Sequence, residues 1–237
     1  AIGAGWSGLA EFYLHRLLFT EAEEAFRSAV QMMQATDDAA PAQRHLLALM
    51  QVAQAGFLNM LTRYDEAGGP VQAAIEYAEA AGDDAVKARA YLQAGTALYR
   101  RGRYAPALDA YQAALTAATT ARLKAIEGDI LRQIGTSLLE KSDFAAARHH
   151  LEQALAIYRQ VGNRIGEGNA LNDLGWLGQR EQNFTDALAY LQAALRLHRA
   201  IDNRHGVSIV LINQGIVYEM LGEYNQAYDC YLEVQQL

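Results

Sequence analysis

Apolar residues recur with helical spacing along this chain and are interrupted by short polar turns. The segment 163–201 carries one stripe of small or apolar side chains at Ala170, Leu171, Leu174, Gly175 and Leu177. Gln182 and Asn183 break the pattern, and a second stripe follows at Phe184, Ala187, Leu188, Leu191, Ala194 and Leu195. Spacing of i, i+3, i+4 forms one apolar face of a helix. The segment therefore predicts two helices joined by a tight turn.

The helix pair recurs with a period of forty residues. Glycines mark this period at Gly95, Gly135, Gly175 and Gly215. Nine positions after each glycine stands an aromatic residue, at Tyr104, Phe144, Phe184 and Tyr224, and three positions later an alanine, at Ala107, Ala147, Ala187 and Ala227. The frame extends one unit back through Ala55, Tyr64 and Ala67. A fixed period of about 20–50 residues indicates stacked structural repeats.

The recurring glycines need a packing reason, because glycine in mid-helix costs about 1 kcal/mol relative to alanine. We expect another helix to approach closely at each glycine, through the alanine twelve residues later, for example Gly175 against Ala187. A local kink at each glycine is the alternative. The acidic pairs Asp37-Asp38 and Asp83-Asp84 and the pair Ser142-Asp143 are expected to start the helices that follow them.

Composition narrows the class of function. The net charge is −7, so the basic footprint of a nucleic-acid-binding protein is missing. A single cysteine, Cys230, excludes a disulfide framework and a four-cysteine metal site. No apolar run approaches the roughly 18 residues of a membrane span. We therefore expect no nucleic-acid partner, no membrane partner and a cytoplasmic location. The chain starts without methionine and stops within a helical pattern at 231–237, which we interpret as a piece of a longer protein.

The chain resembles the tetratricopeptide repeat (TPR), whose first helix follows Trp-x2-Leu-Gly-x2-Tyr. The N-terminal unit matches best, with Trp6, Leu9, Ala10 and Tyr13, followed by Phe19, Ala22, Phe26 and Ala29. The resemblance implies an all-α fold, a right-handed superhelical solenoid of about six helix hairpins. It also implies a single array, with units at about 1–38, 39–82, 83–121, 122–161, 162–201 and 202–237.

Two features depart from the regular frame. The step from Ala10 to Ala55 is 45 residues long, which places five extra residues around Thr36–Ala40. In the second unit, Gly68-Gly69-Pro70 falls within the expected second helix. Proline inside a helix costs about 3 kcal/mol. We therefore expect this helix to begin late, near Pro70, or to be kinked there.

The resemblance further implies a concave binding groove lined by the first helices. An almost continuous polar row lies along it at Gln93, Gln133, Asp173 and Asn213. Amides both donate to and accept from a peptide backbone, and tryptophan and arginine are enriched in binding hot spots. The predicted ligand- or peptide-binding set is Arg89, Gln93, Thr96, Arg100, Arg132, Gln133, Thr136, Asn169, Asn172, Asp173, Trp176, Arg180 and Asn213. The alternative is a merely solvated face, with Trp176 packed on the neighbouring repeat.

Other signals are interpreted as structural. Gly3, Gly5 and Gly8 spell G-x-G-x-x-G, but no strand precedes them, so we do not expect nucleotide binding. His149 and His150 diverge by about 100° on a helix, and the remaining histidines are scattered over separate units at His15, His45, His198 and His205. No serine, cysteine or histidine arrangement indicates a nucleophile. We expect no catalytic residues, no metal and no cofactor.

The predicted function is therefore non-enzymatic recognition. The forty-residue period and the linkers resemble a subtype found in repeat sensors of bacterial signal-transduction (STAND) NTPases, kinesin light chains and Pins-type adaptors. This resemblance implies the sensor or scaffold region of a bacterial signalling regulator, which binds a protein, a peptide, an inducer or other domains of its parent protein. Two alternatives stay open: a stand-alone peptide-binding adaptor, and a self-association module that joins through its end repeats.

Overall fold

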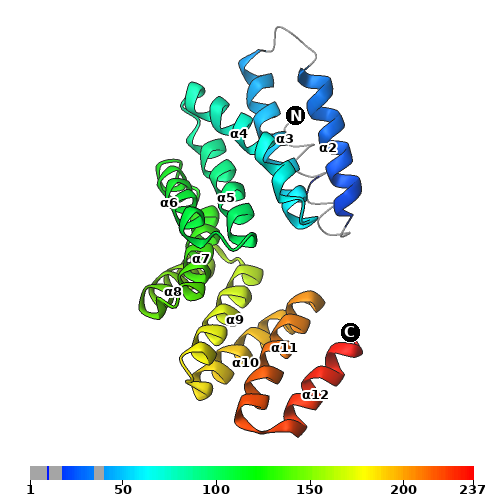
Figure 1. Cartoon of the computed structure of the whole chain (residues 1–237), viewed down its shortest axis with the longest axis vertical. Helices are drawn as coiled ribbons and strands as arrows, with labels where there is room; N and C mark the ends of the chain where they lie inside the picture. Colours follow the sequence, from blue (N-terminus) through cyan, green and yellow to red (C-terminus); the bar gives the residue numbers. More distant parts are fainter. Residues whose placement is uncertain (1–9, 11–17, 35–39) are drawn as a thin grey trace. The chain divides into compact units, whose positions relative to one another are not determined.

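The computed structural model describes residues 10, 18–34 and 40–237, which form eleven α-helices and no strand (Figure 1). The predicted all-α architecture of tandem hairpins is thereby confirmed. The helices are α2 (Phe19–Gln34), α3 (Pro41–Met60), α4 (Tyr64–Ala81), α5 (Asp84–Arg100), α6 (Tyr104–Thr120), α7 (Lys124–Glu140), α8 (Phe144–Val161), α9 (Arg164–Arg180), α10 (Phe184–Ala200), α11 (Arg204–Leu221) and α12 (Tyr224–Gln235).

The chain divides into two compact units, Ala1–Leu123 and Lys124–Leu237. The first unit contains α2 to α6, and the second contains α7 to α12. Within each unit every helix packs against the next one along the chain. The first helices of successive hairpins also touch, α3 with α5 in the first unit, and α7 with α9 and α9 with α11 in the second. This arrangement places the first helices side by side within a unit.

A left-handed residue ends a helix at every twentieth position. These positive-φ residues are Thr62, Gly82, Gly102, Arg122, Ser142, Gly162, Gln182, Asp202 and Gly222. The amide of the following residue then donates to the carbonyl five residues earlier, as from Asn183 to Gly178 at 2.8 Å. This geometry satisfies carbonyls that have no partner within the helix, and so it ends the helix sharply. The forty-residue period is therefore two helix-plus-turn segments of twenty residues.

Side-chain caps begin five of the helices directly after these turns. The capping residues are Asp83, Asp143, Asn163, Asn183 and Asn203, and each accepts from the backbone N–H three residues later. A cap of this kind satisfies one of the unpaired amides at a helix start. The predicted roles of Asp83 and Asp143 are confirmed, whereas Asp37 and Asp38 lie outside the described residues. The extra residues expected around Thr36–Ala40 also fall there, apart from Ala40.

The expected late start of α4 is wrong. This helix begins at Tyr64 and runs through Pro70 to Ala81. Its first turn is held by packing and charge, because Ala67 is 1% exposed within a core cluster and Arg63 pairs with Glu66. Those contacts outweigh the one backbone hydrogen bond that proline cannot donate.

The close approach predicted at the frame glycines is confirmed, although the expected contact is only part of it. A Cβ atom added at Gly175 would lie 2.6 Å from Cγ of Leu191 and 3.3 Å from the Ala187 carbonyl oxygen. The main contact is thus the side chain sixteen residues later, because the second helix lays that larger side chain across the glycine. The same geometry holds at Gly135, where Leu151 is the nearest neighbour. Helix α9 therefore has no room for a side chain at its frame position.

Candidate binding groove

In the second unit, the predicted site residues lie on three adjacent first helices, α7, α9 and α11. Two polar contacts join these helices with the same spacing of 41 residues. Nη1 of Arg132 on α7 lies 2.9 Å from Oδ2 of Asp173 on α9. The amide nitrogen of Asn213 on α11 donates to Oδ1 of Asn172 on α9 at 2.8 Å. These two contacts link the three first helices of the unit through Arg132, Asp173, Asn172 and Asn213, and we call them the polar ladder.

A cavity of about 240 Å³ opens beside this ladder. It gathers four of the predicted residues, Arg132, Asn169, Asn172 and Asp173. Five residues complete its lining that were not in the predicted set: His198, His205, Gly206, Ile209 and Val210. The second helix α10 thus contributes His198 to a site that was assigned to first helices alone.

Glycine pairs create the slot through which a side chain of the second helix reaches the groove. His198 is 1% exposed, and a Cβ at Gly168 on α9 or Gly206 on α11 would lie 2.6 Å from its Cε1 or Cγ atom, respectively. Forty residues earlier, Tyr158 of α8 lies in the same way against Gly166 and Gly128. These paired glycines are the sequence signal for the slot, although neither Tyr158 nor His198 was in the predicted set.

The two side chains that fill these slots, Tyr158 and His198, each place a polar atom near the groove. The Tyr158 hydroxyl donates to Oδ1 of Asp129 at 2.8 Å. The Asn203 amide nitrogen lies 3.1 Å from Nδ1 of His198. Desolvation lowers the pKa of His198, and the charge of His205 adds to that effect. His198 is therefore held in its neutral form near neutral pH.

The ionised groups of the groove are short of positive charge. Burial raises the pKa of Asp173, and the Arg132 guanidinium offsets part of this rise. Burial likewise raises the pKa of Asp129, with the Tyr158 hydroxyl and Arg132 opposing it. Burial lowers the pKa of Arg132, but its attraction to the carboxylates outweighs that cost and shifts the pKa upward overall. One half-buried guanidinium thus hydrogen-bonds Asp173 and attracts the charge of Asp129, which leaves an excess of hydrogen-bond acceptors.

The remaining predicted residues of this unit lie in different settings. Thr136 is 5% exposed and donates to the Gln133 carbonyl oxygen at 3.1 Å, so its hydroxyl is used within α7. Trp176 and Gln133 are half-buried. Arg180 lies 6.0 Å from the Phe144 ring centroid and 3.9 Å from Glu140, which ties it to the α7–α8 turn. None of these four side chains lines the cavity beside the ladder.

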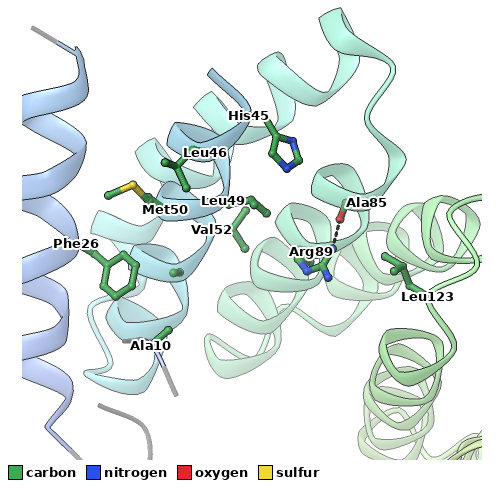
Figure 2. Close-up of a pocket in the computed structure, with 11 residues that line it drawn as sticks. Ala10, Phe26, His45, Leu46, Leu49, Met50, Val52, Ala85, Arg89 and Leu123 are labelled. Atoms are coloured by element: carbon green, nitrogen blue, oxygen red, sulfur yellow. Dashed lines mark hydrogen bonds between the residues drawn. The ribbon is translucent and has the colours of Figure 1, made fainter. Parts of the chain in front are cut away.

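In the first unit, the predicted residues Arg89, Gln93, Thr96 and Arg100 all lie on α5. Asn59 of α3 donates to both the backbone and the side-chain oxygen of Gln93, at 3.1 Å each. Thr96 donates to the Leu92 carbonyl oxygen at 2.9 Å. Arg100 is exposed, whereas Arg89 lines a large cavity (Figure 2). These four side chains belong to a separate compact unit, so the predicted set falls into two groups.

Among the residues that the structure describes, no three histidine, cysteine or carboxylate side chains are grouped to hold a metal ion. No helix of this part of the chain is long and apolar enough to cross a membrane. Gly3, Gly5, Gly8, Trp6 and His15 lie outside the described residues.

Solved structures with similar folds come from several kinds of protein. BtubC from P. vanneervenii has a TM-score of 0.76 and 17% identity, over 92% of this chain and 90% of its own. A STAND protein with a tetratricopeptide repeat sensor from Pyrococcus horikoshii has a TM-score of 0.74 and 15% identity, over 97% of this chain and 35% of its own. NprR in complex with its cognate peptide NprX has a TM-score of 0.68 and 16% identity, over 98% of this chain and 66% of its own. Identities this low establish the fold alone.

Sequence comparisons identify the family. No curated protein sequence matches the chain. A family model described as the tetratricopeptide repeat matches residues 127–183 and 177–237, and a second model with the same description matches residues 58–122. These matched segments together span most of the chain and cover the helices from α4 onward, apart from the first residues of α7. The chain therefore belongs to the tetratricopeptide-repeat superfamily.

Proposed function

We propose that this chain is a non-enzymatic recognition module that binds an extended peptide, or an extended segment of a partner protein, along α7, α9 and α11. The observation that carries this proposal is the cavity beside the polar ladder, where Arg132, Asp173 and Asn169 meet. Binding sites combine a concave surface with a few convergent polar groups. This cavity has both features.

The unused polar atoms of the groove suit a peptide backbone. The side chain of Asn169 makes no hydrogen bond to any described residue, and the side-chain oxygen of Asn213 accepts none from them. An amide side chain supplies both a donor and an acceptor, as a peptide unit requires. The acceptor excess around Asp129 and Asp173 favours a ligand that brings N–H or ammonium donors.

The context of such binding is part of the same proposal. NprR, which shares the fold, is described in complex with a cognate peptide, and the STAND protein carries its repeats as a sensor. These likenesses support a sensor or scaffold region in a cytoplasmic signalling regulator, in which the bound segment changes the state of an attached domain. A stand-alone adaptor would use the same groove without a switch.

The test is a selection of random displayed peptides on the immobilised chain, followed by calorimetry with the enriched peptide. Asn169→Ala and Trp176→Ala should each weaken binding by about tenfold, which corresponds to about 1.4 kcal/mol. Asn225→Ala, an exposed amide on α12, is the matched control and should bind like the parent. Equal affinity of all four proteins would place the binding site elsewhere, and a selection that enriches no peptide would count against the proposal itself.

Self-association is a second candidate, favoured by the exposed surface of α12. Tyr224 and Tyr228 are 72% and 65% exposed, and Leu232, one further turn along, is 38% exposed. Residues spaced by four lie on one helix face, and exposed apolar patches mark contact surfaces. Sedimentation over a concentration series tests this candidate, and Tyr228→Glu should abolish any dimer. A monomer at all concentrations would exclude it.

A further inference from the structure

A larger cavity, of about 450 Å³, lies within the first unit, and its chemistry differs from that of the groove (Figure 2). Helix α3 contributes Leu46, Leu49 and Val52 to its wall, and α5 contributes Ala85 and Arg89. Cavities of about 300–1,000 Å³ are the size that binds small molecules. The described wall is apolar except for His45 and Arg89, so these two side chains decide what can enter.

Arg89 is the polar group that remains available. The other polar side chain of the described wall is His45, whose Nδ1 lies 2.7 Å from Oδ2 of Asp83. Among the described residues no carboxylate pairs with Arg89, and its one hydrogen bond runs from Nη1 to the Ala85 carbonyl oxygen of its own helix at 2.9 Å. A guanidinium has five N–H donors, so the described residues leave most donors of Arg89 unused.

The position of Arg89 is unfavourable for a charge that no described carboxylate neutralises. Burial lowers the pKa of Arg89, and the more distant charge of Asp83 only partly compensates. Arg89 also lines a second cavity of about 220 Å³, which shares Val52 and Ala53 with the first. The guanidinium therefore stands where two apolar spaces meet. Arg89 is half-buried, and a charge partly removed from water is stabilised by a partner of opposite charge, which an anion placed here would supply.

We propose that this cavity binds a small monocarboxylic acid with an apolar body, its carboxylate on Arg89 and its hydrocarbon chain against Leu49, Val52 and Ala53. Arginine and carboxylate match as a bidentate pair. A peptide is a poorer occupant, because each of its backbone amides would need a partner that the apolar wall lacks. This site is separate from the peptide groove on α7, α9 and α11 and does not depend on it.

Calorimetry on the whole chain with three ligands of equal length tests the proposal directly. Decanoate, used below its micellar concentration, should bind at least about tenfold tighter than decanol or decylammonium, since a charge-assisted pair is lost in both of these. Equal binding of all three would show an apolar space without carboxylate recognition and would overturn the proposal. A trileucine peptide with a free carboxylate that bound tighter than decanoate would overturn the choice of a free acid.

Variants place the site. Arg89→Met should weaken decanoate binding by about tenfold or more and leave decanol binding unchanged. Arg103→Met, at an exposed arginine before α6, is the matched control and should bind like the parent. Ala53→Leu should weaken both ligands by filling the space where the two cavities meet. Unchanged decanoate binding in both Arg89→Met and Ala53→Leu, with helicity preserved, would exclude this cavity.

Discussion

The packing of His198 makes the stability of the second unit depend on pH. The side-chain oxygen of Asn203 accepts from the Gly206 amide at 3.0 Å, so the side-chain nitrogen of Asn203 faces His198 and donates to its Nδ1. Protonated histidine has donors on both nitrogens, and it would therefore lose this acceptor. Burial, followed by the nearby charge of His205, lowers the pKa of His198 in agreement with that geometry.

We expect the second unit to lose stability in mild acid. Between the lowered pKa and the ordinary histidine value of about 6.5, the unfolded chain binds more protons than the folded one. The free energy of unfolding therefore rises with pH in this window and falls as the solution is acidified. Urea unfolding at pH 7 and pH 5 measures the difference.

Two variants assign that effect. His198→Tyr, which copies Tyr158 of the preceding repeat, should reduce the loss of stability on acidification. His149→Gln, at an exposed histidine of α8, should leave it as in the parent. His150 also has a pKa lowered by burial, so part of the dependence should persist. An unchanged dependence in His198→Tyr would contradict the assignment.

Gly175 and Gly68 should respond to alanine in opposite directions. A Cβ at Gly175 would meet Cγ of Leu191 at 2.6 Å, whereas at Gly68 no atom lies within 4 Å. Gly175→Ala should cost about 1–3 kcal/mol of stability through overpacking. Gly68→Ala should gain up to about 1 kcal/mol from helix propensity. Thermal unfolding of both variants measures this, and a gain of stability in Gly175→Ala would refute the close approach.

At the scale of single residues, the sequence predicted the packing role of the repeated small residues better than the roles of the polar residues. Gly175 could be identified from the forty-residue period, because a glycine that destabilises a helix is repeated in every unit only where packing requires it. His198 has no period, since Tyr158 holds the equivalent position, and its partners Gly168 and Gly206 lie on two other helices. Its place in the cavity is a tertiary contact that helical spacing alone cannot reveal.

At the scale of the helices, Pro70 is the clearest conflict between local preference and packing. It lies inside α4, whereas Pro41 is the first residue of α3. We expect Pro70→Ala to raise the melting temperature, with a gain of about 1–3 kcal/mol from the restored hydrogen bond and the removed clash. Pro41→Ala, the control, should give no gain, because proline suits a first helical turn. A lower melting temperature in Pro70→Ala would mean that the proline makes a packing contact worth more than the lost bond.

Helix ends were only partly readable from the sequence. Four of the nine left-handed turn residues are glycine, but Thr62, Arg122, Ser142, Gln182 and Asp202 adopt the same conformation. A non-glycine residue adopts the left-handed conformation only at an energetic cost. Here the packing of the repeats imposes that conformation every twenty residues. The caps Asn163, Asn183 and Asn203 follow directly, so a cap residue marked these turns better than the turn residue itself.

At the scale of the molecule, repeat stacks are stabilised by contacts between neighbours. In the second unit, Tyr158 of α8 fills the space left by Gly128 on α7 and Gly166 on α9, and His198 of α10 does the same between α9 and α11. Each hairpin of this unit therefore packs against the next one through an aromatic side chain that lies between two glycines. The sequence showed the period of this stack, but the division into compact units after Leu123 depends on contacts that no local pattern records.

This packing of aromatic side chains between glycines predicts that the segment 124–237 folds when it is produced alone. It contains three hairpins, the number at which repeat stacks become stable, and both ring contacts are internal to it. Circular dichroism should show a helical spectrum and a single cooperative melt. The shorter segment 164–237 is the control, because it loses α7, α8 and the Tyr158 ring that covers Gly166, and it should melt at a lower temperature. A non-cooperative melt of 124–237, or equal melting temperatures for the two segments, would show that the ring between glycines does not couple the hairpins.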